Sequence, residues 1–296
     1  MKIGITGASG MLGSAIIKDL SGTHEIFATS RSKGLTLCNV QWDCFDLTDS
    51  NRLTGWLVNS DVDLVIHCAA MIDVDRCEDS VVETTKINSE STRVLARHLD
   101  SKGKKLIYIS TDAVFDGEKE GPYIESDTVL PLNVYAKTKL LGEDPVLKMT
   151  RGLVLRVNII GWRADKKNSF FEWLLKGLEE KQHLNLFGDV LFSPLNVTDL
   201  SKIITQIIDK ELIGLYHCGS RDHCSKYQFG MRVADIFRLS TEKITRVDIE
   251  DVDLKAPRPK NLALDSSKLN RVLGYQLPSV DEAINLMKEQ YELNGS

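Results

Sequence analysis

The sequence of 296 residues lacks the features that mark several specialised classes of protein. Its longest apolar run covers only residues 64–72, whereas a helix that crosses a bilayer needs about 20 apolar residues. Lys and Arg (37) do not outnumber Asp and Glu (42), and the net charge is −5. This balance provides no basic face for nucleic acid. We therefore expect neither a membrane nor a nucleic acid as a partner.

The cysteines and histidines are also few and show no ligand-like spacing. None of the six cysteines forms a Cys-x-x-Cys pair, and their density is too low for a disulfide scaffold. No histidine stands at metal-ligand spacing from a cysteine, so we expect no metal site. The first residues are too short and too glycine-rich for a secretory signal. These absences predict a cytoplasmic protein with reduced thiols.

What the sequence does contain is an alternation of apolar runs and helical patterns. At this length the chain approaches the upper limit for one hydrophobic core. A long helical pattern at residues 80–99 separates two of the apolar runs, and no internal repeat is present. Such alternation predicts an α/β fold with a doubly wound parallel sheet. The expected strands of the first half are residues 2–6, 24–29, 40–44, 63–68, 105–110 and 152–158.

Three glycines directly follow the first expected strand. Glycines at such a turn let the backbone bend tightly and approach a pyrophosphate, and the next helix presents free N–H groups to the phosphates. The spacing is Gly-x-x-Gly-x-x-Gly and differs from the Gly-x-Gly-x-x-Gly fingerprint, so the match alone is also compatible with an ordinary tight turn. Its place after the first strand favours a dinucleotide site. The expected cofactor-binding residues of this turn are Gly7, Ser9, Gly10, Met11, Leu12 and Gly13.

The end of the second expected strand bears on the choice of cofactor. An acidic residue there binds the ribose of NAD, whereas an arginine accommodates the 2′-phosphate of NADP. The chain has Ser30-Arg31 at this point, which favours NADP(H), with NAD as the alternative cofactor and a solvated loop arginine as the structural alternative. Further along, Asp46-Leu47 is placed to contact the adenine, although such a pair also begins many helices.

Two later strand ends carry small or hydroxyl side chains. The run at residues 63–68 leads into Cys68-Ala69-Ala70, whose small side chains would let a cofactor lie against the backbone. The run at residues 105–110 leads into Thr111. Ligands of doubly wound sheets bind outside the carboxyl ends of the strands. We therefore expect the Thr111 hydroxyl to point at a substrate.

Tyr135 and Lys139 are four positions apart, so on a helix they lie on one face. Bringing a tyrosine pKa from ~10 to ~7 requires roughly 4 kcal/mol. An exposed ammonium about 4 Å away contributes only roughly 1 kcal/mol in water, so burial or a second positive charge is needed. An oxidised nicotinamide carries such a charge. On spacing alone, an ordinary amphipathic helix pair is the alternative.

Taken together, these motifs resemble the extended short-chain dehydrogenase/reductases. The glycine turn, Ser110-Thr111-Asp112 and Tyr135-x-x-x-Lys139 carry this resemblance. The longer strings Ser-Thr-Asp-Ala-Val-Phe-Asp-Gly and Asn-Val-Tyr-Ala-Lys-Thr-Lys-Leu-Leu-Gly-Glu are similar to the dTDP-4-dehydrorhamnose reductase branch. The likeness covers nearly the whole chain. It implies a Rossmann-type cofactor domain at residues 1–158 and a mainly substrate-binding lobe at residues 159–296, some segments of which pack back on the first domain.

The resemblance also implies roles for individual residues. Tyr135 would protonate the developing alkoxide, Lys139 would lower the pKa of Tyr135 and hold the nicotinamide ribose, and Thr111 would hydrogen-bond the substrate carbonyl. Tyr135, Lys139 and Asn88 would also contact the cofactor. The residues implied to bind a nucleotide-sugar substrate are Asp112, Val114, Phe115, Asn158 and Arg258.

Departures from the family pattern affect the predicted activity. Related sugar-nucleotide dehydratases carry Asp-Glu after the threonine, whereas Asp112 is followed here by Ala113, which favours reduction over elimination of water. The family's tryptophan beside the sugar is absent after the sixth strand, and a tryptophan comes later, at Trp162. We therefore expect an NADPH-dependent reductase of a 4-keto-6-deoxy sugar nucleotide whose sugar the sequence leaves open.

Two alternatives share this scaffold. One is a noncatalytic NADP-binding subunit similar to the regulatory subunit of methionine adenosyltransferase, although the presence of Thr111, Tyr135 and Lys139 argues against it. The other is a sugar-nucleotide epimerase, which would retain and recycle its cofactor. The resemblance is compatible with a homodimer.

Overall fold

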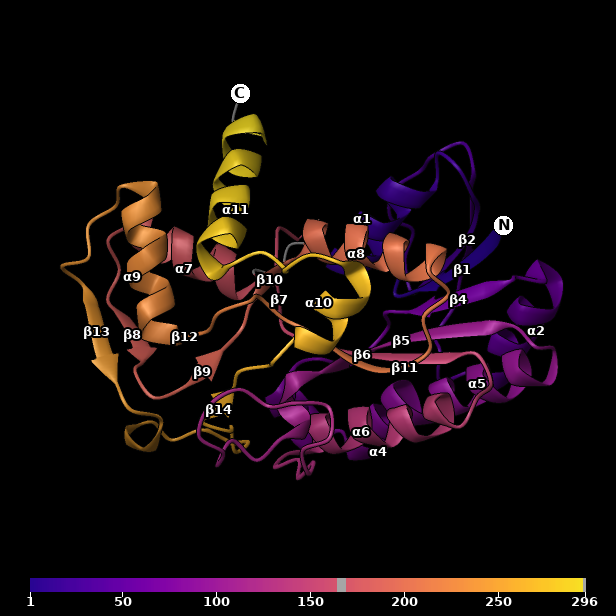
Figure 1. The fold of residues 1–296 in the computed structure, drawn as a ribbon, viewed down its shortest axis with the longest axis horizontal. Coiled ribbons are helices and arrows are strands. Elements are labelled where there is room, and N and C mark those ends of the chain that lie inside the picture. The colour runs from indigo at the N-terminus through magenta and orange to yellow at the C-terminus, as the bar shows by residue number, and fades with distance from the viewer. Residues whose placement is uncertain (164–168, 295–296) are drawn as a thin grey trace.

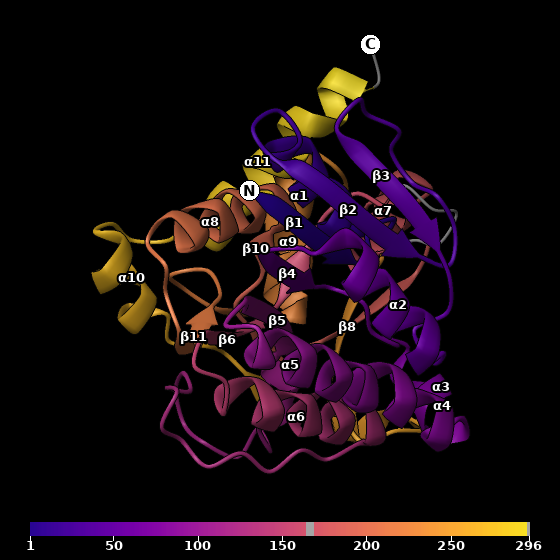
Figure 2. The same ribbon diagram turned by 90° about the vertical axis from the view of Figure 1, so that its right-hand side faces the viewer.

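The framework of the protein is a seven-stranded parallel sheet with the order β11-β6-β5-β4-β1-β2-β3, seen in a computed structural model that describes residues 1–163 and 169–294 (Figures 1 and 2). This sheet confirms the predicted doubly wound α/β fold. The strand boundaries lie within about one residue of the expected ones. The strands are β1 (Lys2–Thr6), β2 (Glu25–Ser30), β3 (Val40–Cys44), β4 (Leu64–His67), β5 (Lys105–Thr111), β6 (Gly152–Val157) and β11 (Gly214–Cys218).

Helices cover both faces of this sheet. On one face lie α1 (Met11–Leu20) and α8 (Val197–Asp209), which pack against each other, and α10 (Ser267–Leu273) lies against β11. On the other face lie α2 (Ser50–Ser60), α5 (Ser91–Ser101) and α6 (Val134–Leu147). Figure 2 shows the two layers on opposite sides of the strands. With both faces covered, the central strands are apolar throughout, as parallel strands usually are.

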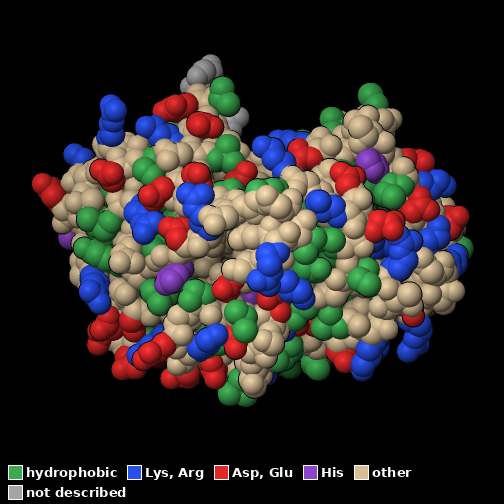
Figure 3. Space-filling model, viewed as in Figure 1, with side chains coloured by type: hydrophobic (Ala, Val, Ile, Leu, Met, Phe, Trp, Pro, Cys, Tyr) green, Lys and Arg blue, Asp and Glu red, His purple; other side chains and the backbone are tan. Residues whose placement is uncertain are grey.

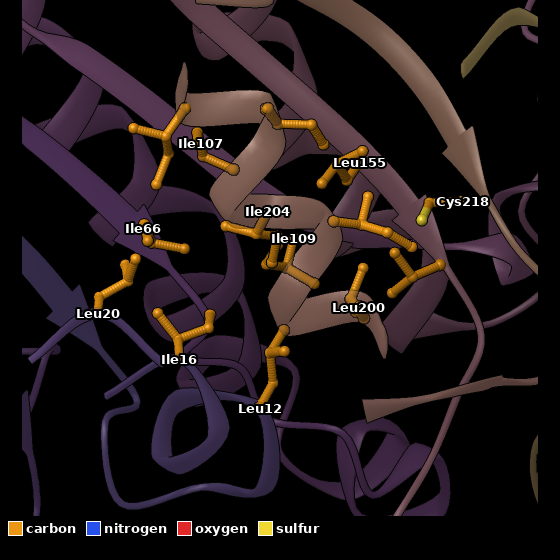
Figure 4. Packing of buried hydrophobic residues seen from close by; sticks show 14 of the residues in the cluster. Leu12, Ile16, Leu20, Ile66, Ile107, Ile109, Leu155, Leu200, Ile204 and Cys218 are labelled. Carbon is orange, nitrogen blue, oxygen red and sulfur yellow. The ribbon is translucent and has the colours of Figure 1, made fainter. Parts of the chain in front are cut away.

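The largest hydrophobic core lies between the sheet and the α1/α8 layer. Figure 4 shows side chains of α1, the central strands and α8 pointing toward one another. Ile16, Ile66, Ile107 and Ile204 meet there and are fully buried. The buried positions of α1 recur every three or four residues, which is the period of a helix with one apolar face. This packing fixes the start of α1, and with it the glycine turn, against the carboxyl ends of the strands.

A second lobe is built from the second half of the chain around its own core (Figure 1). Its helices are α7 (Phe170–Glu179), α9 (Lys226–Phe237) and α11 (Val280–Asn294). Its strands are short and form three small sheets, β10-β7, β12-β9-β14 and β13-β8. These strands are β7 (Ile159–Ile160), β8 (Leu184–Phe187), β9 (Leu191–Phe192), β10 (Leu195–Asn196), β12 (Cys224–Ser225), β13 (Ile244–Val247) and β14 (Asn261–Leu262). The second half thus supplies both this lobe and β11, α8 and α10 of the main framework.

The expected helix at residues 80–99 is interrupted. After a short helix α3 (Val74–Asp79), α4 (Val81–Thr85) runs into a π-helical segment (Lys86–Glu90) and then into α5. Such π-helical turns are frequent at functional sites. The segment turns Asn88 inward, where it is fully buried. Hydrophobic periodicity cannot reveal this insertion, because the apolar pattern continues on both sides of it.

Charged side chains of both signs are interspersed over the face of the molecule seen in Figure 3. Within the described ranges, no helix has the combination of length and apolar character that crossing a membrane requires. The same ranges hold no group of three or more His, Cys, Asp or Glu side chains that could bind a metal ion.

Candidate active site

The carboxyl ends of four neighbouring strands meet at one edge of the main sheet. β1 ends at the glycine turn, β4 at Cys68, β5 at Thr111 and β6 at Asn158. In the parallel pairing of β1 with β4, Thr6 lies opposite His67. The parallel topology therefore gathers the glycine turn and the residues at the ends of β4, β5 and β6 at a single edge.

The start of α6 is held firmly at this edge. Asn133 is the N-cap, and its Oδ1 accepts a hydrogen bond from the amide of Ala136 at 2.9 Å. The amide of Val134 donates to Oε1 of Glu78 at 2.8 Å. Two of the helix's free first-turn donors are thus satisfied. Tyr135, the second residue of α6, is consequently fixed in place and is half-buried.

Lys139 follows one turn later and is almost completely buried. Its Nζ donates to the carbonyl of Ile109 in β5 at 2.6 Å and lies 4.0 Å from the centroid of the Tyr108 ring. Burial lowers the pKa of Lys139 to about 7, and the negative charge of Glu143 acts in the opposite direction. The pKa of the Lys139 ammonium therefore lies close to neutral pH, and the side chain is anchored to β5, the strand that carries Thr111.

Glu143 occupies the next turn of the same face and forms a buried ion pair. Its Oε2 accepts from Arg156 of β6 at 2.7 Å, and its Oε1 accepts from the Ser110 hydroxyl at 2.5 Å. Both members of the pair are 4% exposed or less. Breaking a buried pair of this kind typically costs about 3–5 kcal/mol. This network fixes α6 to β5 and β6, and the sequence analysis did not identify it.

The Tyr135 phenol is held in its protonated form. Burial raises the pKa of Tyr135 to about 12, and its interaction with the Thr111 hydroxyl only partly offsets this. The phenol is thus fully protonated at neutral pH. It can still protonate an alkoxide, because an alkoxide is about as basic as hydroxide, whose conjugate acid has a pKa of ~15.7.

Asp112 and Asn158 lie beside Thr111. The Thr111 hydroxyl donates to Oδ1 of Asp112 at 3.0 Å, and the Asn158 amide donates to Oδ2. Burial raises the pKa of Asp112 to about 6, although both hydrogen bonds favour its charged form. The geometry therefore links Asp112 directly to the threonine and Asn158 to it through Asp112.

The glycine turn has the shape that a pyrophosphate requires. Gly7 has a φ of +64°, and a Cβ there would lie 2.7 Å from the backbone of Ala69. A Cβ on Gly13 would lie 2.4 Å from the Gly7 carbonyl oxygen. No side chain caps α1 and no acidic residue stands in its first turn, so the N-terminal amides of the helix are free for an anion. These residues fit a dinucleotide cofactor.

A buried histidine holds β4 against β1 behind this turn. His67 Nδ1 is 2.5 Å from the Thr6 hydroxyl, and its Nε2 is 3.1 Å from the hydroxyl of Thr92 in α5. Burial lowers the pKa of His67 to about 3, so the ring is neutral. Cys68, Ala69 and Ala70 follow directly and are partly exposed. His67 is therefore structural, as the lack of metal-ligand spacing indicated.

Of the residues expected around the adenosine, Arg31 and Asp46 are exposed, Ser30 is half-buried, and Leu47, contrary to the expectation, is buried. Ser30 is the last residue of β2, and its hydroxyl donates to the Ser32 carbonyl at 2.5 Å. Arg31 is exposed directly after it. Asp46 is exposed and accepts from the amide of Thr48, whereas Leu47 is buried in a core beneath α2. The exposed Arg31 is thus accessible to a ribose phosphate, whereas the Ser30 hydroxyl already donates to the backbone.

Asn88 is placed behind the cofactor edge. Its Oδ1 accepts from the Met71 amide at 2.8 Å, and its Nδ2 donates to the Met71 carbonyl and to the Thr138 hydroxyl, both at 3.1 Å. The side chain thereby ties the segment after β4 to α6. Any effect of Asn88 on a cofactor would be exerted through that segment.

Other implied substrate residues are engaged with protein groups. Val114 and Phe115 are fully buried in a small core, and Phe115 stacks on Tyr123 with ring centroids 4.0 Å apart. Arg258 donates to Oδ1 of Asp75 at 2.9 Å and so joins the second lobe to α3. The structure brings these side chains near the site without directing Val114 or Phe115 toward a ligand.

Trp162 lies in the core of the second lobe. Its ring stacks on Tyr291 with a centroid distance of 5.7 Å and meets the edge of Phe171 at 5.4 Å. It therefore does not replace the family's tryptophan beside the sugar.

The comparisons with known proteins agree with this geometry. The sequence matches the family model described as RmlD substrate binding domain over residues 1–293. It is 30% identical to a probable low-salt glycan biosynthesis reductase, Agl14, of Haloferax volcanii, over 97% of this chain and 97% of that protein. It is also 30% identical to methionine adenosyltransferase 2 subunit beta of Mus musculus, over 93% of this chain and 83% of that protein.

The fold is similar to that of a solved structure as well. The crystal structure of dTDP-4-dehydrorhamnose reductase from Bacillus anthracis in complex with NADP superposes with a TM-score of 0.84. The two sequences are 25% identical, and the match covers 98% of this chain and 99% of that one.

Proposed function

Because the chain belongs to the RmlD substrate binding domain family, we propose that it is an NADPH-dependent reductase of a nucleotide-linked 4-keto-6-deoxy sugar. The family includes sugar-nucleotide reductases, and one relative of similar fold was solved with NADP. The substrate that we favour is dTDP-4-dehydrorhamnose. The product would serve the synthesis of a deoxysugar-containing glycan.

One observation carries this proposal, namely the convergence of Thr111, Tyr135 and Lys139 at the sheet edge that also holds the glycine turn. A noncatalytic binding protein needs the turn but has no need of a protonated phenol beside a hydroxyl. The buried Lys139, anchored to the carbonyl of Ile109, gives the site a positive charge without a competing carboxylate on its ammonium.

The residues divide the chemistry in a simple way. NADPH, when bound through the glycine turn and Arg31, supplies the hydride. The Thr111 hydroxyl would turn its single proton from Asp112 to the substrate carbonyl oxygen, and Tyr135 delivers its proton to that oxygen as negative charge develops. Because burial raises the pKa of Tyr135 to about 12, the phenol carries its proton at neutral pH and has it available for the alkoxide. Lys139 orients the nicotinamide ribose.

The lack of a second acid supports reduction over dehydration. Asp112 is the only carboxylate in the 3-10 turn Asp112–Val114, and its next neighbour is Ala113. Elimination of water would need a further acid or base at this position. Reduction of a ketone needs only one proton donor, which Tyr135 provides.

A second candidate is a regulatory subunit, favoured by the 30% identity to methionine adenosyltransferase 2 subunit beta. In that case NADP(H) would bind without turnover, and the protein would copurify with a partner enzyme at fixed stoichiometry. Testing for NADPH oxidation over dTDP-, UDP- and GDP-linked 4-keto sugars separates the two candidates.

The variant Tyr135→Phe tests the proposed chemistry. It removes the proton donor and keeps the ring, so we expect turnover to fall roughly 10²–10⁴-fold, while NADPH affinity measured by fluorescence changes little. Tyr275→Phe, which removes an exposed phenol bonded to Gln206, is the matched control and should be fully active. Wild-type turnover by Tyr135→Phe would refute the mechanism.

A further inference from the structure

A segment of the second lobe, residues 255–260 (the strap), reaches the start of α6. Its downstream end is fixed in the lobe, because the Lys260 carbonyl accepts from the first amide of β9 at 2.7 Å. Within the strap, the Pro257 carbonyl accepts from Nδ2 of Asn133, the N-cap of α6, at 2.9 Å. The strap therefore links the second lobe to the helix that carries Tyr135.

Helix α3 fixes the strap to the cofactor domain. Oδ1 of Asp75 accepts from the Arg258 guanidinium at 2.9 Å and from the Ala256 amide at 3.3 Å. Asp79 forms an ion pair with Lys255. Asp75 and Asp79 are four positions apart, so they lie on one face of α3. The strap is thus held between this face of α3 and the first turn of α6.

Asn133 uses both ends of its side-chain amide. Its Oδ1 accepts from the Ala136 amide and so caps α6, but this bond lies within the helix and moves with it. Its Nδ2 joins the first turn to the strap, and the Val134 amide joins the same turn to Glu78 of α3 at 2.8 Å. The Asn133 side chain is buried, with 2% exposure, so a lost hydrogen bond there leaves an unsatisfied polar group. The position of Tyr135 therefore depends on elements outside α6.

We propose that Asn133 is a positioning residue for the proton donor and acts through its hydrogen bond to the strap. This inference rests on the proposed function. The bond holds the Tyr135 phenol at the oxygen that it protonates, and a displacement of about 1 Å can cost roughly 10²-fold in rate. Because the strap is fixed in the second lobe, the bond also sets Tyr135 relative to that lobe. Arg258, which was expected to bind substrate, serves here to hold the strap on Asp75.

Kinetics with dTDP-4-dehydrorhamnose and NADPH separate this role from a role in folding. Asn133→Ser keeps an oxygen that can cap α6 but is too short to donate to the strap. Asp75→Ala releases the strap from α3 and leaves α6 unaltered. Asn39→Ser is the matched control, because it removes an amide that donates to the Ser21 carbonyl at the amino ends of the strands. Thermal unfolding and NADPH titration check that each variant is folded and binds the cofactor.

We expect kcat to fall roughly ten- to a hundredfold in Asn133→Ser and in Asp75→Ala, with little change in KM or in NADPH affinity. A displaced donor slows proton transfer relative to the other steps, so the solvent deuterium isotope effect on kcat should rise in both variants. The loss in the double variant should be smaller than the product of the two single losses, because both substitutions act through the strap. Asn39→Ser should match the wild type.

Other results would overturn the inference. If Asn133→Ser has the wild-type kcat, the bond to the strap does not position Tyr135. If kcat falls while the solvent isotope effect stays unchanged, the variant merely contains less active protein. If the two single losses multiply, Asn133 and Asp75 do not act through the strap. If the wild type itself oxidises no NADPH with this substrate, the proposed function fails, whereas an active wild type with an unaffected variant refutes the role of Asn133 alone.

Discussion

At the scale of single residues, the site depends on how burial changes three ionisable groups. Burial raises the pKa of Tyr135 to about 12 and of Asp112 to about 6, and it lowers that of Lys139 to about 7. Perturbed groups gathered at one point are typical of functional sites. The sequence identified these residues by spacing and resemblance. It could not give their protonation, because that depends on neighbours from β5, β6 and α9 that are distant in the chain.

Arg31 is the residue that we expect to select NADPH. It is exposed next to Ser30 at the end of β2, where the 2′-phosphate of the cofactor would lie. Arg31→Ala should weaken NADPH binding roughly ten- to a hundredfold, since a charge-assisted hydrogen bond is lost, and should leave NADH binding nearly unchanged. Fluorescence titration with both cofactors measures this, with the exposed Arg93 of α5 replaced by Ala as the control. Equal losses for NADPH and NADH would contradict the assignment.

At the scale of elements, the glycine turn was predictable, whereas the first residue of α6 and the π-helical segment were not. The turn follows from glycines between an apolar strand and a helical pattern. The α6 helix begins at Val134, not at Pro131, which was expected to open it, and it is capped by Asn133, a residue type preferred at that position. The π-helical segment Lys86–Glu90 depends on the hydrogen bonds of Asn88 to Met71 and Thr138, which are tertiary contacts. Pro145 lies inside α6, which ends two residues later, at Leu147.

Two glycine substitutions compare the turn with an unconstrained helix. Gly13→Ala places a Cβ 2.4 Å from the Gly7 carbonyl oxygen, and overpacking of this kind typically costs about 1–3 kcal/mol. We expect a lower free energy of unfolding and at least a roughly tenfold loss of NADPH affinity, because the phosphate-facing amides move. Gly55→Ala in α2, where a Cβ meets nothing within 4 Å, should stabilise the protein by up to ~1 kcal/mol. Denaturant unfolding and NADPH titration measure both effects, and equal behaviour of the two variants would contradict the role of the turn.

At the scale of the whole molecule, the site lies where two separately packed cores meet. β5 provides Thr111, and α6 provides Tyr135 and Lys139. The positive charge of Lys226, in the second lobe, acts on the pKa of Asp112 beside Thr111. Contacts such as Arg258 to Asp75 and the Asn133 amide to the Pro257 carbonyl hold the two parts together. A substrate bound between these two parts of the molecule would contact both of them.

The sequence predicted the first half of the chain better than the second for a physical reason. The first half alternates strands of four to seven residues with helices, and such lengths display a period. In the second half β7, β9, β10, β12 and β14 have two residues each, which is too short for any period. The return of β11 beside β6 is a long-range pairing that local patterns do not encode.

The most direct test of the central claim is to follow a deuterium atom from cofactor to sugar. The wild-type protein is incubated with dTDP-4-dehydrorhamnose and NADPH that carries deuterium at both C4 positions, and the product is analysed by mass spectrometry. We predict one molecule of NADPH consumed per molecule of product and one deuterium on the reduced carbon, with neither seen for Tyr135→Phe. Unlabelled product formed without net consumption of NADPH, or no reaction together with a stoichiometric partner enzyme, would contradict the account.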